Sequence, residues 1–158
     1  MMAWWIAVVL LGGANGLRSF TPIAVLCWFA FSGHLQVQGT WANWTAHLIT
    51  AIVLTVFAVG ELVGDKLPQT PSRTAPFPLG ARIVFGGLVG AIVATCLHEP
   101  IIAGILPGSV CAIAGTFLGF WLRRWLTAER KLPDLPVALA EDAVTILLSI
   151  FAMRIVAG

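Results

Sequence analysis

Five long apolar stretches, joined by short polar connections, are the feature that most restricts how this chain can fold. The 158 residues are 59% hydrophobic and only 10% charged, with a mean hydropathy of +0.95, so there is too little polar surface to cover a water-soluble globule. Because a membrane helix needs about 20 residues, the length allows about four to six segments that span or re-enter the bilayer. We expect an all-α, polytopic membrane protein with a single helical domain over residues 1–158. The five stretches cover residues 3–31, 47–64, 83–97, 101–126 and 135–156.

The first stretch is too long for one upright crossing of the bilayer. Its 29 residues would form a helix of about 43 Å, whereas the hydrocarbon core is about 30 Å thick. Gly12, Gly13 and Gly16 weaken the helix in its middle, and Pro22 removes one helical hydrogen bond. Two arrangements fit: a straight, tilted span, or two half-helices that meet near residues 15–19. Irregular backbone at that depth must be buried in protein or line a watery cavity, and we favour the broken or re-entrant form.

Lysine and arginine counts indicate which side of the membrane each connection occupies. The connections over residues 65–82 and 123–134 hold seven of these side chains, and those over residues 32–46 and 98–100 hold none. Positively charged connections usually stay in the cytoplasm. We therefore expect the first two connections to lie inside the cell and the C-terminus to lie outside.

Small residues recur at four-residue spacing in the third and fourth stretches. Such faces let two helix backbones approach closely in lipid, where packing replaces the hydrophobic effect as the source of attraction. We expect these two helices to pack against each other or across a homodimer interface, although glycine is also simply common in membrane helices. The residues are Gly86, Gly90 and Ala94 in the third stretch and Gly104, Gly108, Ala112, Gly115 and Gly119 in the fourth.

Ionisable side chains lie inside three of the apolar stretches, where a charge is costly and usually functional. Arg18 lies in the first stretch, Glu61 near the end of the second, and Glu141 and Asp142 in the fifth. If the first stretch is a hairpin, arms of about 12 residues reach roughly 18 Å and bring its tip close to the carboxylates. A cation or a proton is the natural partner of such a cluster. The candidate ion- or substrate-binding residues are Asn15, Arg18, Glu61, Asp65, Lys66, Arg73, Glu141 and Asp142.

Structural explanations exist for many of the same residues. Arg18, Glu61 and Asp142 could form a charge cluster that only fixes the register of the helices. The histidines and cysteines near the outer side could bind a soft metal, but their spacing fits no metal template, so interfacial histidines and packing thiols are favoured and the metal stays unknown. The residues that could serve only to orient the chain in the membrane are Asp65, Lys66, Arg73, Arg123, Arg124, Arg130 and Lys131.

Three short motifs carry a resemblance to a known family. They are NGLRS over residues 15–19, GELVGDKLP followed by PSRT within residues 60–74, and AEDA over residues 140–143. They resemble the motifs of small bacterial membrane proteins grouped as a domain of unknown function, DUF4126. The resemblance extends over nearly the whole chain, and the central motif is its most specific part. It implies a multi-pass protein of the bacterial inner membrane and attaches no activity to it.

These observations lead to the hypothesis of a small transporter or channel for an ion or small solute, with proton coupling as one form of the mechanism. Glu61 and Asp142 would bind the cation or pass it on. Arg18 would hold an anionic group or tune the two carboxylates through its charge. Asn15 and the glycines beside it would supply the backbone break that makes a polar cavity open to the cytoplasm.

Two other classes of function remain open. One is a membrane-embedded enzyme acting on a lipid phosphate, in which the basic candidates would hold the phosphate and the acidic ones a divalent metal. The other is an accessory subunit without chemistry of its own. We assign no catalytic residue and expect no cofactor. The expected partners are the lipid bilayer, the ion or solute, and a second copy of the chain bound through the glycine-rich helices; scattered basic residues disfavour nucleic acid.

Overall fold

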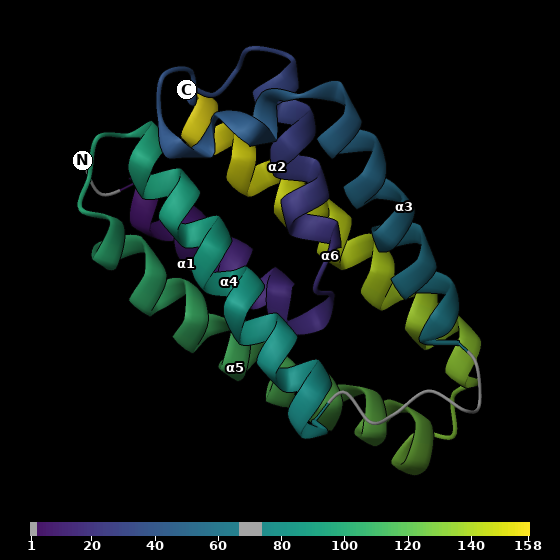
Figure 1. Cartoon of the computed structure of the whole chain (residues 1–158). Helices are drawn as coiled ribbons and strands as arrows, with labels where there is room; N and C mark the ends of the chain where they lie inside the picture. The colour runs from purple at the N-terminus through teal and green to yellow at the C-terminus, as the bar shows by residue number, and fades with distance from the viewer. Residues whose placement is uncertain (1–2, 67–73) are drawn as a thin grey trace.

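The computed structural model describes residues 3–66 and 74–158, and every regular element within them is a helix (Figure 1). The expectation of an all-α protein is confirmed for this part of the chain. A short 3-10 helix, η1, precedes α3, and a π-helical turn, η2, continues α5. The elements are α1 Ala3–Leu17, α2 Thr21–Phe31, η1 Trp41–Ala46, α3 Leu48–Gly64, α4 Pro76–Cys96, α5 Ile101–Arg124, η2 Trp125–Glu129 and α6 Asp134–Ala157.

Three of the helices are long and apolar enough to cross a membrane: α4, α5 together with η2, and α6. The helices α1, α2 and α3 are apolar but shorter, at 15, 11 and 17 residues. These apolar helices support the prediction that the chain is a membrane protein. Five segments that each cross the membrane are not confirmed, mainly because the first apolar stretch forms two short helices.

A break divides the first apolar stretch at residues 18–20, between α1 and α2. Pro22 lies in the first turn of α2, where its missing N–H removes no helical hydrogen bond. The ring of Phe20 packs on Phe57 of α3 and Phe85 of α4, with 5.3 and 4.9 Å between ring centroids. The straight single span is therefore wrong, and the stretch is a pair of half-helices whose junction is fixed by packing. The expectation that Asn15 and the glycines beside it supply the break is also wrong, because they lie inside α1 and the chain leaves the helix only after Leu17.

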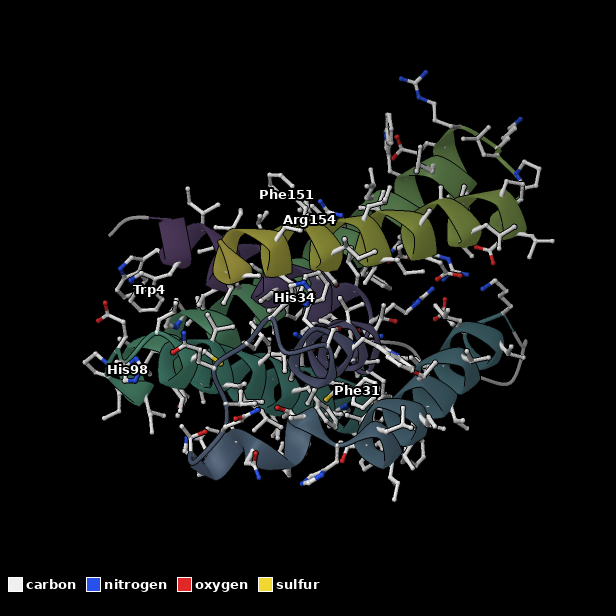
Figure 2. The ribbon with its side chains drawn as sticks, turned by 90° about the horizontal axis from the view of Figure 1, so that it is seen from above. Trp4, Phe31, His34, His98, Phe151 and Arg154 are labelled. Carbon is white, nitrogen blue, oxygen red and sulfur yellow. The ribbon has the colours of Figure 1, made fainter. Side chains whose placement is uncertain are left out.

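The helices run between two chemically different ends of the molecule (Figure 1). We call one the histidine end; it contains residues 32–47, residues 97–100 and the C-terminus. Figure 2 shows Trp4 and His98 at this same end. The other, the arginine end, contains residues 65–66, η2 and the first turns of α4 and α6. Thus α1 runs inward from the histidine end and α2 returns toward it, and the break points toward the arginine end.

Glycines let the backbones of α4 and α5 approach each other closely. A Cβ atom added at Gly90 would overlap the backbone oxygen of Gly104, and one added at Gly108 would overlap that of Gly86. The helix α1 packs on α5 in the same way, because a Cβ at Gly115 would overlap the backbone of α1. The expected packing of the third and fourth stretches against each other is confirmed. These contacts lie within one chain, and the homodimer stays a prediction.

The start of α4 is the largest error in the expected helix boundaries. The sequence places a connection up to Arg82 and a helix from Ile83, whereas α4 begins at Pro76. Pro76 and Pro78 both fit the first turn of a helix, where no intrahelical N–H is needed. Arg82 consequently lies inside α4 and is only 4% exposed.

Candidate functional site

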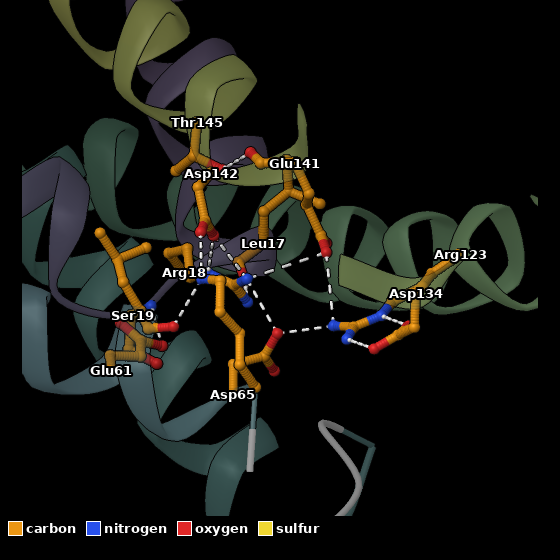
Figure 3. Close-up of polar contacts among 12 residues, drawn as sticks. Leu17, Arg18, Ser19, Glu61, Asp65, Arg123, Asp134, Glu141, Asp142 and Thr145 are labelled. Carbon is orange, nitrogen blue, oxygen red and sulfur yellow. Dashed lines mark hydrogen bonds and ion pairs between the residues drawn. The ribbon is translucent and has the colours of Figure 1, made fainter. Parts of the chain in front are cut away.

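Arg18 occupies the break between α1 and α2 and is completely buried. Its Nε and Nη2 atoms both donate to Oδ1 of Asp142 on α6, at 2.9 and 2.6 Å, and Nη2 also donates to Oδ2 of Asp65 at 2.9 Å (Figure 3). The break directs this side chain at the carboxylates because Arg18 is the first residue after α1. A buried guanidinium is tolerated only when it is paired in this manner.

Asp142 joins two cations through its two oxygens. While Oδ1 accepts from Arg18, Oδ2 accepts from Nζ of Lys66 at 2.6 Å. The ammonium of Lys66 is held in place by a second bond, which it donates to the carbonyl of Leu62 at 2.7 Å. Asp142 is therefore the carboxylate at the centre of the cluster, and α6 presents it among small buried neighbours such as Ala138.

A second arginine extends the cluster toward the surface. Nη1 of Arg123, at the end of α5, donates to Oδ2 of Asp65 at 2.6 Å. The other side of the same guanidinium donates to both oxygens of Asp134, at 2.9 and 2.7 Å. Glu141 lies between the two arginines, with Oε2 at 3.9 Å from Nη2 of Arg18 and 3.8 Å from Nη1 of Arg123. Cations and carboxylates thus alternate along the cluster.

The cluster leads from the protein interior to the arginine end. The side chain of Arg18 is 0% exposed and that of Asp142 is 9% exposed, whereas that of Lys66 is 22% exposed. Asp134, at the far side, is 60% exposed. Charge is therefore costly to remove at Arg18, where no water replaces a lost partner, and cheap to remove at Asp134.

Glu61 has a different position from the other acids. Its Oε1 accepts from the backbone N–H of Ser19 at 2.7 Å, and its Oε2 accepts from that of Phe20 at 2.9 Å (Figure 3). These donors lie at the N-terminus of α2, which has no side-chain cap of its own and carries a partial positive charge. Glu61 thus caps α2 from a neighbouring helix and holds the break in shape.

Uncompensated polar atoms lie close to the break. Asn15 donates from Nδ2 to the carbonyl of Leu11 at 2.9 Å, but its Oδ1 is buried without a partner among the described residues. The same is true of Oγ1 of Thr21. On α6, the buried hydroxyls of Thr145 and Ser149 donate back to their own helix and keep their lone pairs free for further bonds. Buried polar atoms of this kind are commonly satisfied by water or a ligand.

The structure gathers most of the candidates that the sequence indicates. Arg18, Asp65, Lys66, Glu141 and Asp142 form one cluster, while Glu61 and Asn15 flank the break beside it. Arg73 lies outside the described residues. Sequence reasoning missed Arg123 and Asp134 as members of the cluster, because arginines at a cytoplasmic connection are expected simply to orient the chain.

Asp65, Asp134 and Asp142 are each bound to side-chain cations. Within residues 3–66 and 74–158, no group of three or more His, Cys, Asp or Glu side chains is placed to hold a metal ion. Cys27, Cys96 and Cys111 are free thiols. The arrangement can do two things chemically: it can fix four helices by charge, or it can exchange one of its cations for another.

One sequence family matches nearly the whole chain, including the residues of the cluster that the structure describes. The family profile described as a domain of unknown function, DUF4126, matches residues 6–155, and the chain belongs to this family. The match includes the break, Glu61 of α3, Asp65 and the acids of α6. No curated protein and no solved structure matches the chain.

The cap formed by Glu61 gives a testable expectation. Glu61→Gln keeps the size of the side chain but leaves only one acceptor for two backbone N–H groups and removes the charge. We expect a loss of about 2 kcal/mol in the free energy of unfolding, the usual contribution of a charge-assisted hydrogen bond, and faster hydrogen exchange at Ser19 and Phe20. Glu129→Gln, on the exposed surface of η2, is the matched control. Equal stability of the two variants would contradict the capping role.

Proposed function

We propose that this protein moves a small ion or solute across the membrane, and that the cluster around Arg18 and Asp142 is the site where that species binds. The observation that supports this most is the complete burial of Arg18 at a helix break, joined to Asp142. Ionisable groups at membrane depth are costly and are concentrated in ion and proton pathways. Proton coupling is one form that this transport would take, with carboxylates as carriers.

The broken helix supports the same class. Irregular backbone at membrane depth is tolerated where it lines a cavity or is buried in protein, and transporters build their sites from discontinuous helices. Here Arg18, in the break, binds Asp142, and Asn15 and Thr21 on either side of the break each have a buried oxygen without a partner among the described residues. These atoms would complete the coordination of an ion or of an ordered water that enters the site.

Lys66 gives the proposal a mechanism. Its ammonium is a tethered cation on Oδ2 of Asp142 and is partly exposed at the arginine end. A cation that arrives from this end would take the place of the ammonium on Asp142, while Arg18 keeps its bonds to Oδ1 of Asp142 and to Asp65. Exchange of one cation for another keeps both oxygens of Asp142 paired throughout, which avoids the cost of a buried carboxylate oxygen without a partner.

The orientation that fits this mechanism puts the arginine end in the cytoplasm. The positively charged connections lie there, and those of the histidine end carry no lysine or arginine. In this orientation α1 enters from outside, the chain turns at residues 18–20, and α2 returns, so that α1 and α2 form a re-entrant hairpin. The C-terminus would then lie outside, and the bacterial inner membrane is the location we propose for the protein.

Cysteine labelling tests this orientation. Gln38→Cys lies at the histidine end and Glu129→Cys at the arginine end, and both positions are exposed. A membrane-impermeant thiol reagent should modify only the first in intact cells and both after permeabilisation. The parent chain, whose Cys27 and Cys96 are buried, serves as the background control. If only Glu129→Cys were labelled in intact cells, the arginine end would lie outside and the proposed orientation would be wrong.

Transport itself is tested with the native protein in sealed lipid vesicles. Imposed gradients of protons, Na⁺ and K⁺ are followed with indicator dyes inside the vesicles, with empty vesicles as the baseline. We expect at least one gradient to collapse faster with protein present, and more slowly again when a competing cation is added on the arginine side. No difference from empty vesicles for any gradient would contradict the proposal for these ions.

A further inference from the structure

A cavity of about 360 Å³ lies at the arginine end, between α5 with η2 and α6, and adjoins the charge cluster. Its lining is apolar apart from Arg123 and Glu141, which belong to the charge cluster. The volume falls within the roughly 300–1,000 Å³ of ordinary ligand sites. Among the apolar residues of the wall are Leu122, Leu126, Val137, Ala140 and Val144.

Three basic residues lie close in sequence to residues that line this cavity. Arg124, Arg130 and Lys131 are exposed, and none of them is paired with an acid in the described part of the chain. Their neighbours in sequence, Leu126 and Leu132 among them, line the cavity. The guanidinium of Arg130 is held over the ring of Trp125, 4.7 Å from its centroid, which fixes the position of this cation at the end of η2.

We infer that this site binds an anionic phospholipid, with one acyl chain in the cavity and the phosphate against Arg124, Arg130 and Lys131. The apolar wall suits a hydrocarbon chain, and the one cation in it, Arg123, is already bound to Asp65 and Asp134. Arg124, Arg130 and Lys131, none of which is paired with an acid among the described residues, attract an anionic headgroup more strongly than a zwitterionic one. Exposed Trp121 and Trp125 place this end of α5 at the level of lipid headgroups.

The inference goes beyond the proposed transport and does not depend on it. It explains why apolar side chains surround a space at the arginine end and why three cations there lack acids. A chain bound in the cavity would touch Leu17, the residue before Arg18, and would shield Arg123 and Glu141 from water. The lipid would therefore stabilise the folded protein whatever the cluster does.

The experiment measures the melting temperature of the full-length protein in detergent with added phosphatidylglycerol, phosphatidylcholine or inorganic phosphate. For the native chain we expect phosphatidylglycerol to raise the melting temperature by roughly 5 °C more than phosphatidylcholine, and inorganic phosphate to have no effect. Changing Arg124, Arg130 and Lys131 together to glutamine should abolish the difference, because each cation contributes about fivefold to anionic-lipid affinity. Ala140→Phe, which fills the cavity, should abolish it as well.

Matched controls separate the site from general charge and bulk effects. Arg154→Gln removes a cation at the histidine end, and Ala143→Phe adds a ring on α6 away from the cavity; both should keep the native preference for phosphatidylglycerol. Equal stabilisation by the two lipids, or an unchanged preference in the triple variant, would overturn the inference. Two results would show that no acyl chain binds in the cavity and would overturn the site: an unchanged preference for phosphatidylglycerol in Ala140→Phe, or a rise in melting temperature with inorganic phosphate as large as that with phosphatidylglycerol.

Discussion

Arg18→Met is expected to lower the free energy of unfolding by about 3–5 kcal/mol, the range for removing one partner of a buried ion pair. Methionine fills much of the same space but leaves Asp142 with only Lys66 and removes one cation from Asp65. No water reaches the position of Arg18 to compensate. For a chain of this size the melting temperature should fall by roughly 10 °C.

A double-mutant cycle shows whether this loss comes from the pair itself. Asp142→Asn should make the loss caused by Arg18→Met smaller by about 0.5–3 kcal/mol, because the two side chains are in direct contact. Arg154→Met removes an exposed arginine at the histidine end and should change stability little. If Arg18→Met is as stable as Arg154→Met, the buried cluster does not hold the helices as described.

Gly104→Ala should be the most damaging single methyl group that can be added to the core. A Cβ atom at Gly104 would overlap the backbone oxygen of Gly90, and a backbone group cannot move aside without separating α4 from α5. We expect a loss of about 3 kcal/mol in the free energy of unfolding. Reversible unfolding in mixed detergent measures it.

Gly60→Ala is the matched control for the helix contact. No atom lies within 4 Å of a Cβ added at Gly60, which is also a helical glycine. Alanine should be neutral there or stabilising by up to about 1 kcal/mol, because it favours the helix more than glycine does. A loss at Gly104 no greater than at Gly60 would show that the two backbones are not in close contact.

The sequence predicts the parts of this fold that depend on local composition. Apolar length predicts a membrane protein, and the small residues spaced by four predict that α4 and α5 pack closely. A break in the first stretch is also predicted, but Gly12, Gly13 and Gly16 lie inside α1, where Gly12 and Gly16 face α5, and the break follows them at residues 18–20. Each of these features can be read within a single segment, without knowing which other segment packs against it. The sequence places the start of α4 too late, because Pro76 and Pro78 indicate a connection. Proline also fits the first turn of a helix, and α4 begins at Pro76.

The membership of the cluster could be predicted only in part. Arg18 and Asp142 stand out because each lies within an apolar stretch. Arg123 does not, since its role depends on how α5 is rotated and on where Asp134 lies after the turn at η2. The capping role of Glu61 depends on α2 having no side-chain cap of its own, which becomes visible once the break has a geometry.

The central claim is that the buried cluster binds what the protein moves, and one comparison tests it most directly. Ion flux per folded molecule and melting temperature are measured on the same vesicle preparations for the native chain, Asp142→Asn and Asp134→Asn. Both substitutions remove one carboxylate charge from the same cluster, but Asp142 lies at its buried centre and Asp134 at its exposed edge. We predict flux at the level of empty vesicles for Asp142→Asn and nearly native flux for Asp134→Asn. Native flux per folded molecule in Asp142→Asn, together with a lowered melting temperature, would contradict the claim and make the cluster a structural lock.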